Sequence, residues 1–277
     1  MHQPQHRVAV ITGAASGIGR GLAERAPTER LHLVLADRDG EALERLAAQL
    51  REQGVQVLTR VTDVADAAQL ERLRDAAVQR FGAVDLLFNN AGVMQTGNCW
   101  ELSEAQWQRA LAVNLGGVIN GIRAFLPLLL AQGRPAHVVN TASLAGLLNS
   151  PFMAAYNVSK QAVVSLSESL HYEMAALNAQ VGVSVLCPGP VASEIMTSDQ
   201  GQGAASELNR LLDGQIRQGM SPAELAEQVF AAIAEKRFWI LPHKGFKPAL
   251  RARLESVLEE RNPQFNLFDP QGDAHVA

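Results

Sequence analysis

Residues 8–19 read VAVITGAASGIG, a short apolar run followed at once by a glycine-rich turn. Gly13, Gly17 and Gly19 allow a tight turn and a close approach of the backbone to a ligand. When such a turn joins a strand to a helix, its N–H groups and the helix dipole attract a pyrophosphate. The turn is also compatible with an ordinary strand–helix connection, so the rest of the chain has to decide between the two.

Further apolar runs follow at regular intervals, separated by segments of helical length. Their β-branched composition is typical of strands buried on both faces. Between them, apolar residues recur at helical spacing, as at Leu43, Leu46 and Leu50. This alternation predicts an α/β fold, a Rossmann-type doubly wound parallel β-sheet flanked by helices. The predicted strands lie near residues 8–11, 31–35, 55–61, 84–88, 137–140 and 183–186.

No repeat or linker divides the 277 residues, so one dinucleotide-binding domain is predicted for 1–277, with its core at about 6–245. Residues 193–219 are rich in Gly, Ser and Gln, and we expect them to form a mobile substrate lid. Residues 246–277 are predicted to be a C-terminal helical extension. Pro27 falls inside the first predicted helix, which we therefore expect to end early or to kink.

The composition argues against several classes of partner. A net charge of -4 offers no basic surface for nucleic acid. No apolar run approaches the roughly 20 residues that span a bilayer, and the polar residues 1–7 leave no room for a signal peptide. We therefore expect a cytoplasmic protein with neither a membrane nor a nucleic-acid partner. Two Cys and seven His lack metal-ligand spacing, so no metal site is predicted.

The second predicted strand ends at Asp37, where a carboxylate can accept hydrogen bonds from both hydroxyls of an adenine ribose. Its charge would repel a 2′-phosphate by roughly 4 kcal/mol at about 4 Å and an effective dielectric near 20. NAD is therefore the predicted cofactor. Arg38 could attract that phosphate instead, which leaves an NADP-dependent carbonyl reductase as an alternative.

With these features, residues 6–245 resemble the short-chain dehydrogenase/reductase family. The matching motifs are Thr12-Gly-x-x-x-Gly-x-Gly19, Asp63-Val64, Asn89-Asn90-Ala91-Gly92, Asn114, Ser143, Tyr156-x-x-x-Lys160, Pro188-Gly189-Pro190-Val191 and Ser193. The resemblance implies that Asp63 binds the adenine amino group, and that Ser193, where the family usually has Thr, keeps a hydroxyl for the nicotinamide carboxamide. The cofactor-binding residues that it implies are Gly13, Ser16, Gly17, Ile18, Gly19, Asp37, Arg38, Asp63, Val64, Asn90, Ala91, Gly92, Tyr156, Lys160, Pro188, Gly189, Val191 and Ser193.

Tyr156 and Lys160 are four residues apart in a segment of helical character, so their side chains share one face. If removal from water does not offset it, a Lys ammonium about 4 Å away would lower the pKa of Tyr156 from about 10 by roughly three units, toward the value of a working base. Ser143 follows an apolar strand, at the end of the sheet where ligands bind. The resemblance makes Ser143, Tyr156, Lys160 and Asn114 the catalytic set. Asn114 would bend its helix and hold a water that relays protons from Lys160.

Residues expected around the nicotinamide are mainly apolar, and we predict that Met94, Leu144, Leu148, Met153, Ile195 and Met196 line the substrate site. This favours a small-molecule secondary alcohol or ketone on an apolar skeleton. Tyr156 would take the hydroxyl proton while hydride passes to the nicotinamide. The family resemblance also implies a homotetramer or homodimer, formed by the helices that carry Asn114 and Tyr156. A non-enzymatic alternative is a dinucleotide-sensing scaffold, against which an intact Ser143, Tyr156 and Lys160 set argues.

Overall fold

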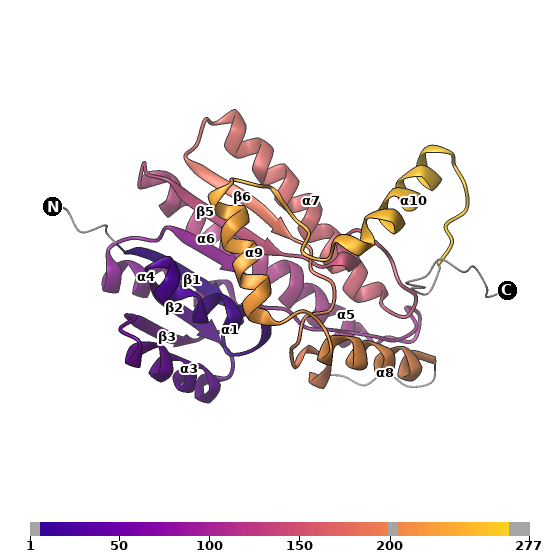
Figure 1. Cartoon of the computed structure of the whole chain (residues 1–277), viewed down its shortest axis with the longest axis horizontal. Helices are drawn as coiled ribbons and strands as arrows, with labels where there is room; N and C mark the ends of the chain where they lie inside the picture. The colour runs from indigo at the N-terminus through magenta and orange to yellow at the C-terminus, as the bar shows by residue number, and fades with distance from the viewer. Residues whose placement is uncertain (1–5, 199–203, 266–277) are drawn as a thin grey trace.

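A computed structural model describes residues 6–198 and 204–265. In these residues seven parallel strands form one sheet in the order β3-β2-β1-β4-β5-β6-β7 (Figure 1). The strands are β1 (Arg7–Thr12), β2 (Leu31–Asp37), β3 (Val57–Val61), β4 (Leu86–Asn89), β5 (Ala136–Thr141), β6 (Val181–Leu186) and β7 (Trp239–Ile240). The chain adds strands outward from β1 to β3 and then continues on the other side of β1 at β4. This reversal is the point at which doubly wound sheets bind ligands.

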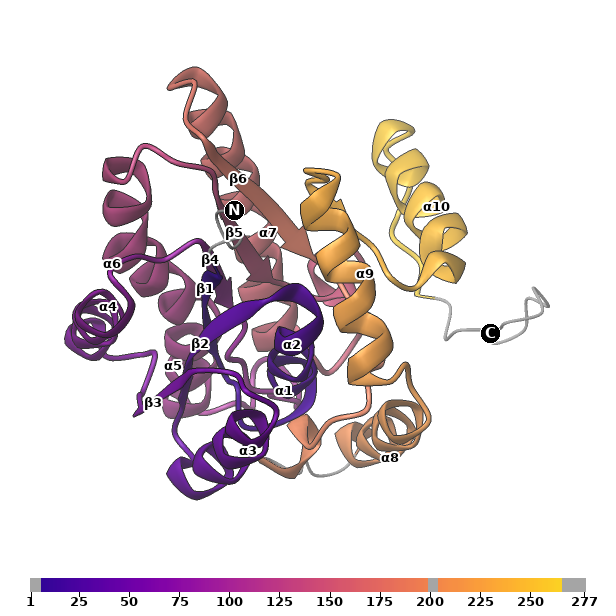
Figure 2. The same cartoon turned by 60° about the vertical axis from the view of Figure 1, so that its left-hand side comes forward.

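Helices cover both faces of the sheet (Figure 2). Because side chains alternate along a strand, Ile11 packs on one face and Val10 on the other. The first face holds α1 (Gly17–Glu24), α2 (Ala26–Glu29), α3 (Gly40–Glu52) and α9 (Pro222–Ala234). The second holds α4 (Ala67–Phe81), α6 (Gly117–Ala131) and α7 (Ala154–Ala176), and α5 (Glu104–Leu111) packs against α7. The buried strands thus lie between two apolar layers, and their loops carry the polar residues.

The remaining elements lie around the carboxyl ends of the strands or beyond β7. They are the π-helix η1 (Ala112–Gly116), the 3-10 helices η2 (Leu144–Gly146), η3 (Ile195–Ser198) and η4 (Lys244–Phe246), and the helices α8 (Ala204–Arg217) and α10 (Lys247–Leu258). Figure 1 shows α10 extending away from the sheet. Part of the predicted lid, residues 199–203, and the last part of the predicted extension, residues 266–277, lie outside the described residues.

The predicted fold class is confirmed, and the six predicted strands are present with shifts of a few residues at their ends. The sequence analysis missed β7, because two residues are too short to show a periodicity. The prediction at Pro27 is also confirmed. The helix α1 ends at Glu24, and Pro27 lies in the first turn of the separate short helix α2, where its missing N–H costs no intrahelical hydrogen bond.

One helix bears on the expectation that the protein has no membrane partner. The continuous helix Glu104–Ala131 is long and apolar enough to cross a bilayer by length and composition. The sequence analysis overlooked it because it considered only unbroken apolar runs. Its residues Val118, Phe125 and Leu129 are buried in the core of this protein. The core helix of an α/β sheet passes the same test, so the helix is weak evidence for a membrane span.

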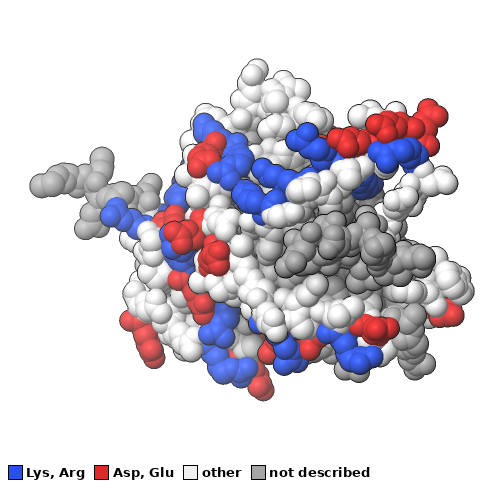
Figure 3. All heavy atoms as spheres, turned by 45° about the vertical axis from the view of Figure 1, so that its right-hand side comes forward, with Lys and Arg blue, Asp and Glu red and all other residues white. Residues whose placement is uncertain are grey.

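The surface carries both signs of charge. On the face in Figure 3, Lys and Arg side chains and Asp and Glu side chains both appear, with uncharged surface between the groups. Ten ion pairs between described residues contribute to this pattern, and four of them join residues one helical turn apart. The pairs whose two side chains are exposed contribute little to stability, on the order of 0–1 kcal/mol each, whereas Arg134 pairs with the buried Asp85.

Candidate active site

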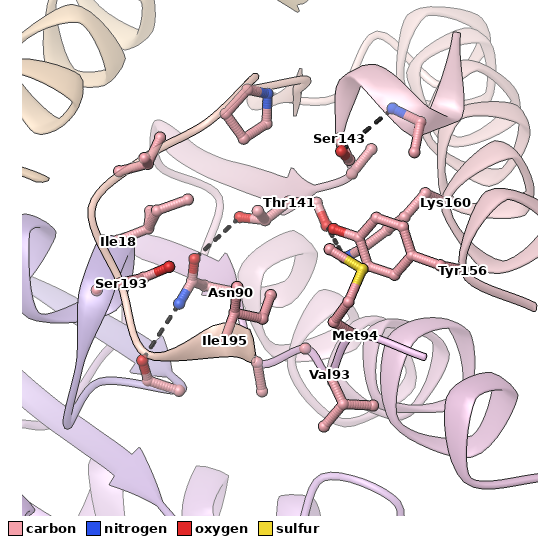
Figure 4. A pocket seen from close by; sticks show the side chains of 18 of the residues that line it. Ile18, Asn90, Val93, Met94, Thr141, Ser143, Tyr156, Lys160, Ser193 and Ile195 are labelled. Atoms are coloured by element: carbon pink, nitrogen blue, oxygen red, sulfur yellow. Dashed lines mark hydrogen bonds between the residues drawn. The ribbon is translucent and has the colours of Figure 1, made fainter. Parts of the chain in front are cut away.

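A cavity of about 370 Å³ opens at the carboxyl ends of the strands, across the point where the strand order reverses. The turn after β1 and the ends of β2 and β3 line one part of it. The loops after β4, β5 and β6, the start of α7, α8 and η4 line the rest. Figure 4 shows Ile18 and Ser193 at one end of the close-up view and Ser143, Tyr156 and Lys160 at the other.

The glycine-rich turn fits closely against the loop after β4. Gly13 has a φ of +64°, and a Cβ there would lie 2.8 Å from the Cα of Ala91. A Cβ on Gly19 would come within 2.0 Å of the carbonyl oxygen of Gly13. Only glycine therefore fits at either position. The Asn90 side-chain amide donates to the carbonyls of Thr12 and Gly13, at 3.1 and 3.3 Å, and accepts from the Thr141 hydroxyl at 3.3 Å (Figure 4).

The Asp37 carboxylate lies beside this turn. One of its oxygens accepts a hydrogen bond from the Ala15 N–H at 2.9 Å, and the other accepts from the Asp39 N–H at 3.1 Å. A carboxylate oxygen has two lone pairs, so each retains one for a further donor. The exposed Arg38 lines the same cavity. The Thr62 N–H donates to the carbonyl oxygen of Asp37 at 2.8 Å. This hydrogen bond brings Asp63 and Val64 to the cavity beside the carboxylate.

Ser143, Tyr156 and Lys160 come together as predicted. Tyr156 and Lys160 are 6% and 2% exposed, so both polar groups are withdrawn from water. The Ser143 hydroxyl is hydrogen-bonded to Tyr156 and also accepts from the Ala145 N–H at 3.2 Å. The Lys160 Nζ donates to the carbonyl oxygen of Thr141 at 2.9 Å and lies 5.7 Å from the centre of the Tyr156 ring.

The predicted effect of Lys160 on the tyrosine is wrong in direction for this structure. Burial raises the pKa of the Tyr156 phenol, and the hydrogen bond from Ser143 opposes this only in part. Burial also lowers the pKa of the Lys160 ammonium to about 8. The predicted shift depended on removal from water not offsetting the Coulomb attraction, and here removal from water is the larger effect and acts against the charged form of both groups. Tyr156 is therefore a proton donor as it stands.

Asn114 lies in the π-helix η1, so the predicted local distortion of its helix is confirmed. Its Oδ1 accepts from the Val93 N–H at 2.8 Å, and its Nδ2 donates to the Val93 carbonyl and to the Ser159 hydroxyl, each at 3.0 Å. A Cβ on Gly92 would lie 3.2 Å from the Asn114 Oδ1 and 3.4 Å from the Lys160 Nζ. Asn114 thus lies behind Lys160 without lining the cavity, and its water-holding role stays a prediction.

The structure places nearly all the predicted site residues on this one cavity. Gly19 lies behind the turn, and Met196 packs on the cluster that contains Met94, Met153 and Tyr156. The predicted residues that do line the cavity are Gly13, Ser16, Gly17, Ile18, Asp37, Arg38, Asp63, Val64, Asn90, Ala91, Gly92, Met94, Ser143, Leu144, Leu148, Met153, Tyr156, Lys160, Pro188, Gly189, Val191, Ser193 and Ile195.

The sequence analysis missed other lining residues, among them Thr141, Leu212, Gln215, Ile216 and Phe246. For α8 a signal was present, because Leu208, Leu212 and Ile216 are spaced by four residues. Thr141 lies two residues before Ser143 at the end of β5 and could have been found by position. Phe246 has no local signal, since it reaches the cavity from beyond β7.

Comparisons with known proteins agree with this geometry. Residues 7–203 match the family model for short chain dehydrogenase. The crystal structure of a short chain dehydrogenase/reductase from Burkholderia phymatum in complex with NAD is similar, with 42% identity and a TM-score of 0.92. That match covers 97% of this chain and 100% of that chain.

Two curated relatives are similar over most of their length. The CLA biosynthesis dehydrogenase/reductase of Lactiplantibacillus plantarum is 30% identical, over 95% of this chain and 97% of the relative. The 1-deoxy-11-beta-hydroxypentalenate dehydrogenase of Streptomyces exfoliatus is 35% identical, over 91% of this chain and 89% of the relative. The chain therefore belongs to the short-chain dehydrogenase/reductase family and is an NAD(P)-binding oxidoreductase that acts on CH–OH donors.

Proposed function

We propose that this enzyme is an NAD(H)-dependent dehydrogenase that interconverts a secondary alcohol and a ketone on a largely apolar small molecule. One observation carries the proposal. A single cavity has the Asp37 carboxylate among its lining residues and also holds the Ser143–Tyr156 pair beside apolar side chains. The first feature suits a ribose with two free hydroxyls, and the second suits a carbonyl or hydroxyl oxygen on a hydrophobic body.

The residues present fit an NAD molecule. Gly13 and Gly19 leave no side chain where a pyrophosphate would approach the first turn of α1. Asp37 would hold the adenine ribose, Asp63 the adenine, Ser193 the carboxamide and Lys160 the nicotinamide ribose. When bound, NAD supplies the hydride acceptor. The NAD-bound relative from Burkholderia phymatum supports the choice of NAD.

In the reduction direction, Tyr156 would donate its phenolic proton to the ketone oxygen, and its raised pKa keeps that proton on the phenol until the reaction. Ser143 would hydrogen-bond the same oxygen. In the oxidation direction, the Tyr156 phenolate would accept the alcohol proton, and the charged Lys160 would stabilise that phenolate. Because the pKa of Lys160 is about 8, its ammonium can exchange protons in the range where such a base works.

The substrate side of the cavity favours an apolar molecule. Met94, Met153, Leu212, Ile216 and Phe246 line it, and no charged side chain stands among the described lining residues from α8 and η4. A charged substrate would lose its hydration there without a partner. The name of the Streptomyces exfoliatus relative refers to a hydroxylated substrate, which supports an alcohol as the reacting group.

We also propose a cytoplasmic homodimer or homotetramer. Cys99 and Cys187 are both free, which suits a reducing compartment. The helices α6 and α7 present exposed apolar side chains, including Ile119 and Val158, that a second copy of the chain would cover.

The test is a fluorescence titration of the purified enzyme with NADH and NADPH, in the wild type and in Asp37→Ala. We expect NADH to bind more tightly, and the variant to lose most of that preference. Asp39→Asn is the matched control, because it changes a neighbouring carboxylate that caps α3. Tighter NADPH binding by the wild type would favour the NADP-dependent alternative through Arg38, and binding of neither would refute the proposal. A screen of apolar secondary alcohols with the preferred cofactor then tests turnover.

A further inference from the structure

His243 lies beyond the residues that match the family model, in the connection between β7 and η4. We propose that His243 is a positioning residue that holds the loop of residues 188–191 in place for the cofactor, and that it must be neutral to do so. The inference rests on the proposed function, because that loop is one wall of the cavity in which NAD would bind.

Both ring nitrogens of His243 bind the backbone of this loop. The Gly189 N–H donates to Nδ1 at 3.0 Å, and Nε2 lies 3.0 Å from the carbonyl oxygen of Pro190. A backbone N–H can only donate and a carbonyl can only accept. The hydrogen therefore sits on Nε2, and Nδ1 carries none. A positively charged ring, with a hydrogen on each nitrogen, would direct an N–H at the N–H of Gly189.

The histidine completes a set of contacts that hold the loop from three sides. The Leu144 N–H donates to the Pro188 carbonyl at 2.9 Å, and the Met220 N–H donates to the Pro190 carbonyl at 3.1 Å. A Cβ on Gly189 would lie 3.0 Å from atoms of His243, Leu144 and Phe246, so the ring also packs on this glycine. The first of these contacts comes from the residue after the catalytic Ser143. Without His243, the Gly189 N–H would lose its acceptor.

His243 acts through the loop rather than on the substrate. Pro188, Gly189, Pro190 and Val191 line the large cavity, whereas His243 lines a smaller adjoining one with Leu241 and Leu250. The described hydrogen bonds of its side chain go to Gly189 and Pro190. A group in this position sets where the loop backbone lies and has no part in proton transfer.

The surroundings keep the ring neutral near pH 7. Burial lowers the pKa of His243, while the Pro190 carbonyl and the Glu224 carboxylate on α9 act in the opposite direction with smaller effect. Lys247 lines the same small cavity as the ring. Acidification would protonate Nδ1 and break the bond to Gly189. We therefore expect cofactor affinity to fall only when the pH drops below 6.5, the pKa of an ordinary histidine.

The experiment compares NADH dissociation constants from pH 5 to 8 in the wild type, His243→Phe and His243→Asn. Phe keeps an aromatic ring but leaves the Gly189 N–H without its acceptor, so we expect the loop to shift and NADH affinity to weaken by roughly tenfold to hundredfold. The Asn carbonyl can accept from Gly189 and does not titrate. We expect His243→Asn to retain most of the affinity and to lose the decline at acid pH. His171→Asn, at a histidine whose ring lies tilted against that of Phe238, is the matched control.

Nitrogen-15 NMR of the His243 ring adds a readout that needs no cofactor. The expected spectrum at pH 7 is that of the neutral tautomer with its hydrogen on Nε2. A charged ring or the other tautomer would overturn the inference, as would wild-type affinity and pH dependence in a folded His243→Phe. If His243→Phe does not fold, the pH profile of His243→Asn decides. Failure of the wild type itself to bind NADH would instead refute the proposed function.

Discussion

At the scale of single residues, the candidate active site buries Tyr156 and Lys160, and burial disfavours the charged form of each. Burial raises the pKa of Tyr156 and lowers that of Lys160 to about 8. Both shifts favour the neutral form of the pair. Tyr156 is therefore ready to donate a proton, and its return to the anion depends on the positive charge that Lys160 holds at or below about pH 8.

The role of Tyr156 is tested by Tyr156→Phe, which removes the hydroxyl and keeps the ring. We expect kcat to fall by about 10²–10⁴, the usual contribution of a general acid or base, while NADH affinity changes little. Steady-state kinetics and the NADH titration measure the two effects separately. The chain offers a matched control in its other tyrosine, Tyr172, which is 65% exposed on the same helix. Equal losses of kcat in Tyr156→Phe and Tyr172→Phe would contradict the assignment.

At the scale of elements, a buried histidine joins β5 to β6. His137 Nε2 lies 2.7 Å from the Ser184 hydroxyl, which in turn donates to the Arg237 carbonyl. The ring therefore donates from Nε2. Its Nδ1 faces Gly182, where a Cβ would come within 2.3 Å of that nitrogen. Burial accordingly lowers the pKa of His137 to about 4.

This shift predicts a loss of stability in acid. Between pH 6.5 and 4 the unfolded chain binds a proton at His137 that the folded chain does not bind. The contribution of His137 to the free energy of unfolding is therefore fully present above pH 6.5 and is lost as the pH falls toward 4. The full loss is about 3 kcal/mol, from roughly 1.4 kcal/mol per pKa unit. Denaturant unfolding at several pH values should show a shallower decline in His137→Val than in the wild type. The same decline in both would assign it to other groups, and His171→Val controls for the loss of one histidine.

The contrast between these elements shows what a sequence can reveal. The glycine turn, Asp37 and the Tyr156–Lys160 spacing were predictable, because a tight turn or a shared helix face restricts residue type locally. His243 was not predictable, because its partners lie 54 and 53 residues away and meet only after β6 and β7 have paired. The direction of the Tyr156 shift was missed for a related reason. Burial is a property of the packed site, which a spacing of four residues does not contain.

At the scale of the whole molecule, the two halves of the sheet contribute different residues to the cavity. The ends of β1, β2 and β3 and the turn after β1 carry the glycines and carboxylates that suit a dinucleotide. The loops after β5 and β6, with α7 and α8, carry Ser143, Tyr156, Lys160 and the apolar wall. Asn90 connects the halves, since its side chain bonds the turn after β1 and Thr141 at the end of β5. The reaction can occur only where both halves meet.

The proposed assembly of copies depends on the exposed face of α7. Val158 lies two residues from Tyr156, on the opposite side of the helix, and is 51% exposed. If α7 packs against a second copy, Val158→Arg buries a charge without a partner and weakens the assembly strongly. Light scattering should give two or four times the 29.8 kDa chain mass for the wild type and a smaller mass for the variant. Leu258→Arg, on α10 at 83% exposure, is the control. Dissociation by Leu258→Arg alone would place the interface on α10 instead, and a monomeric wild type would refute assembly altogether.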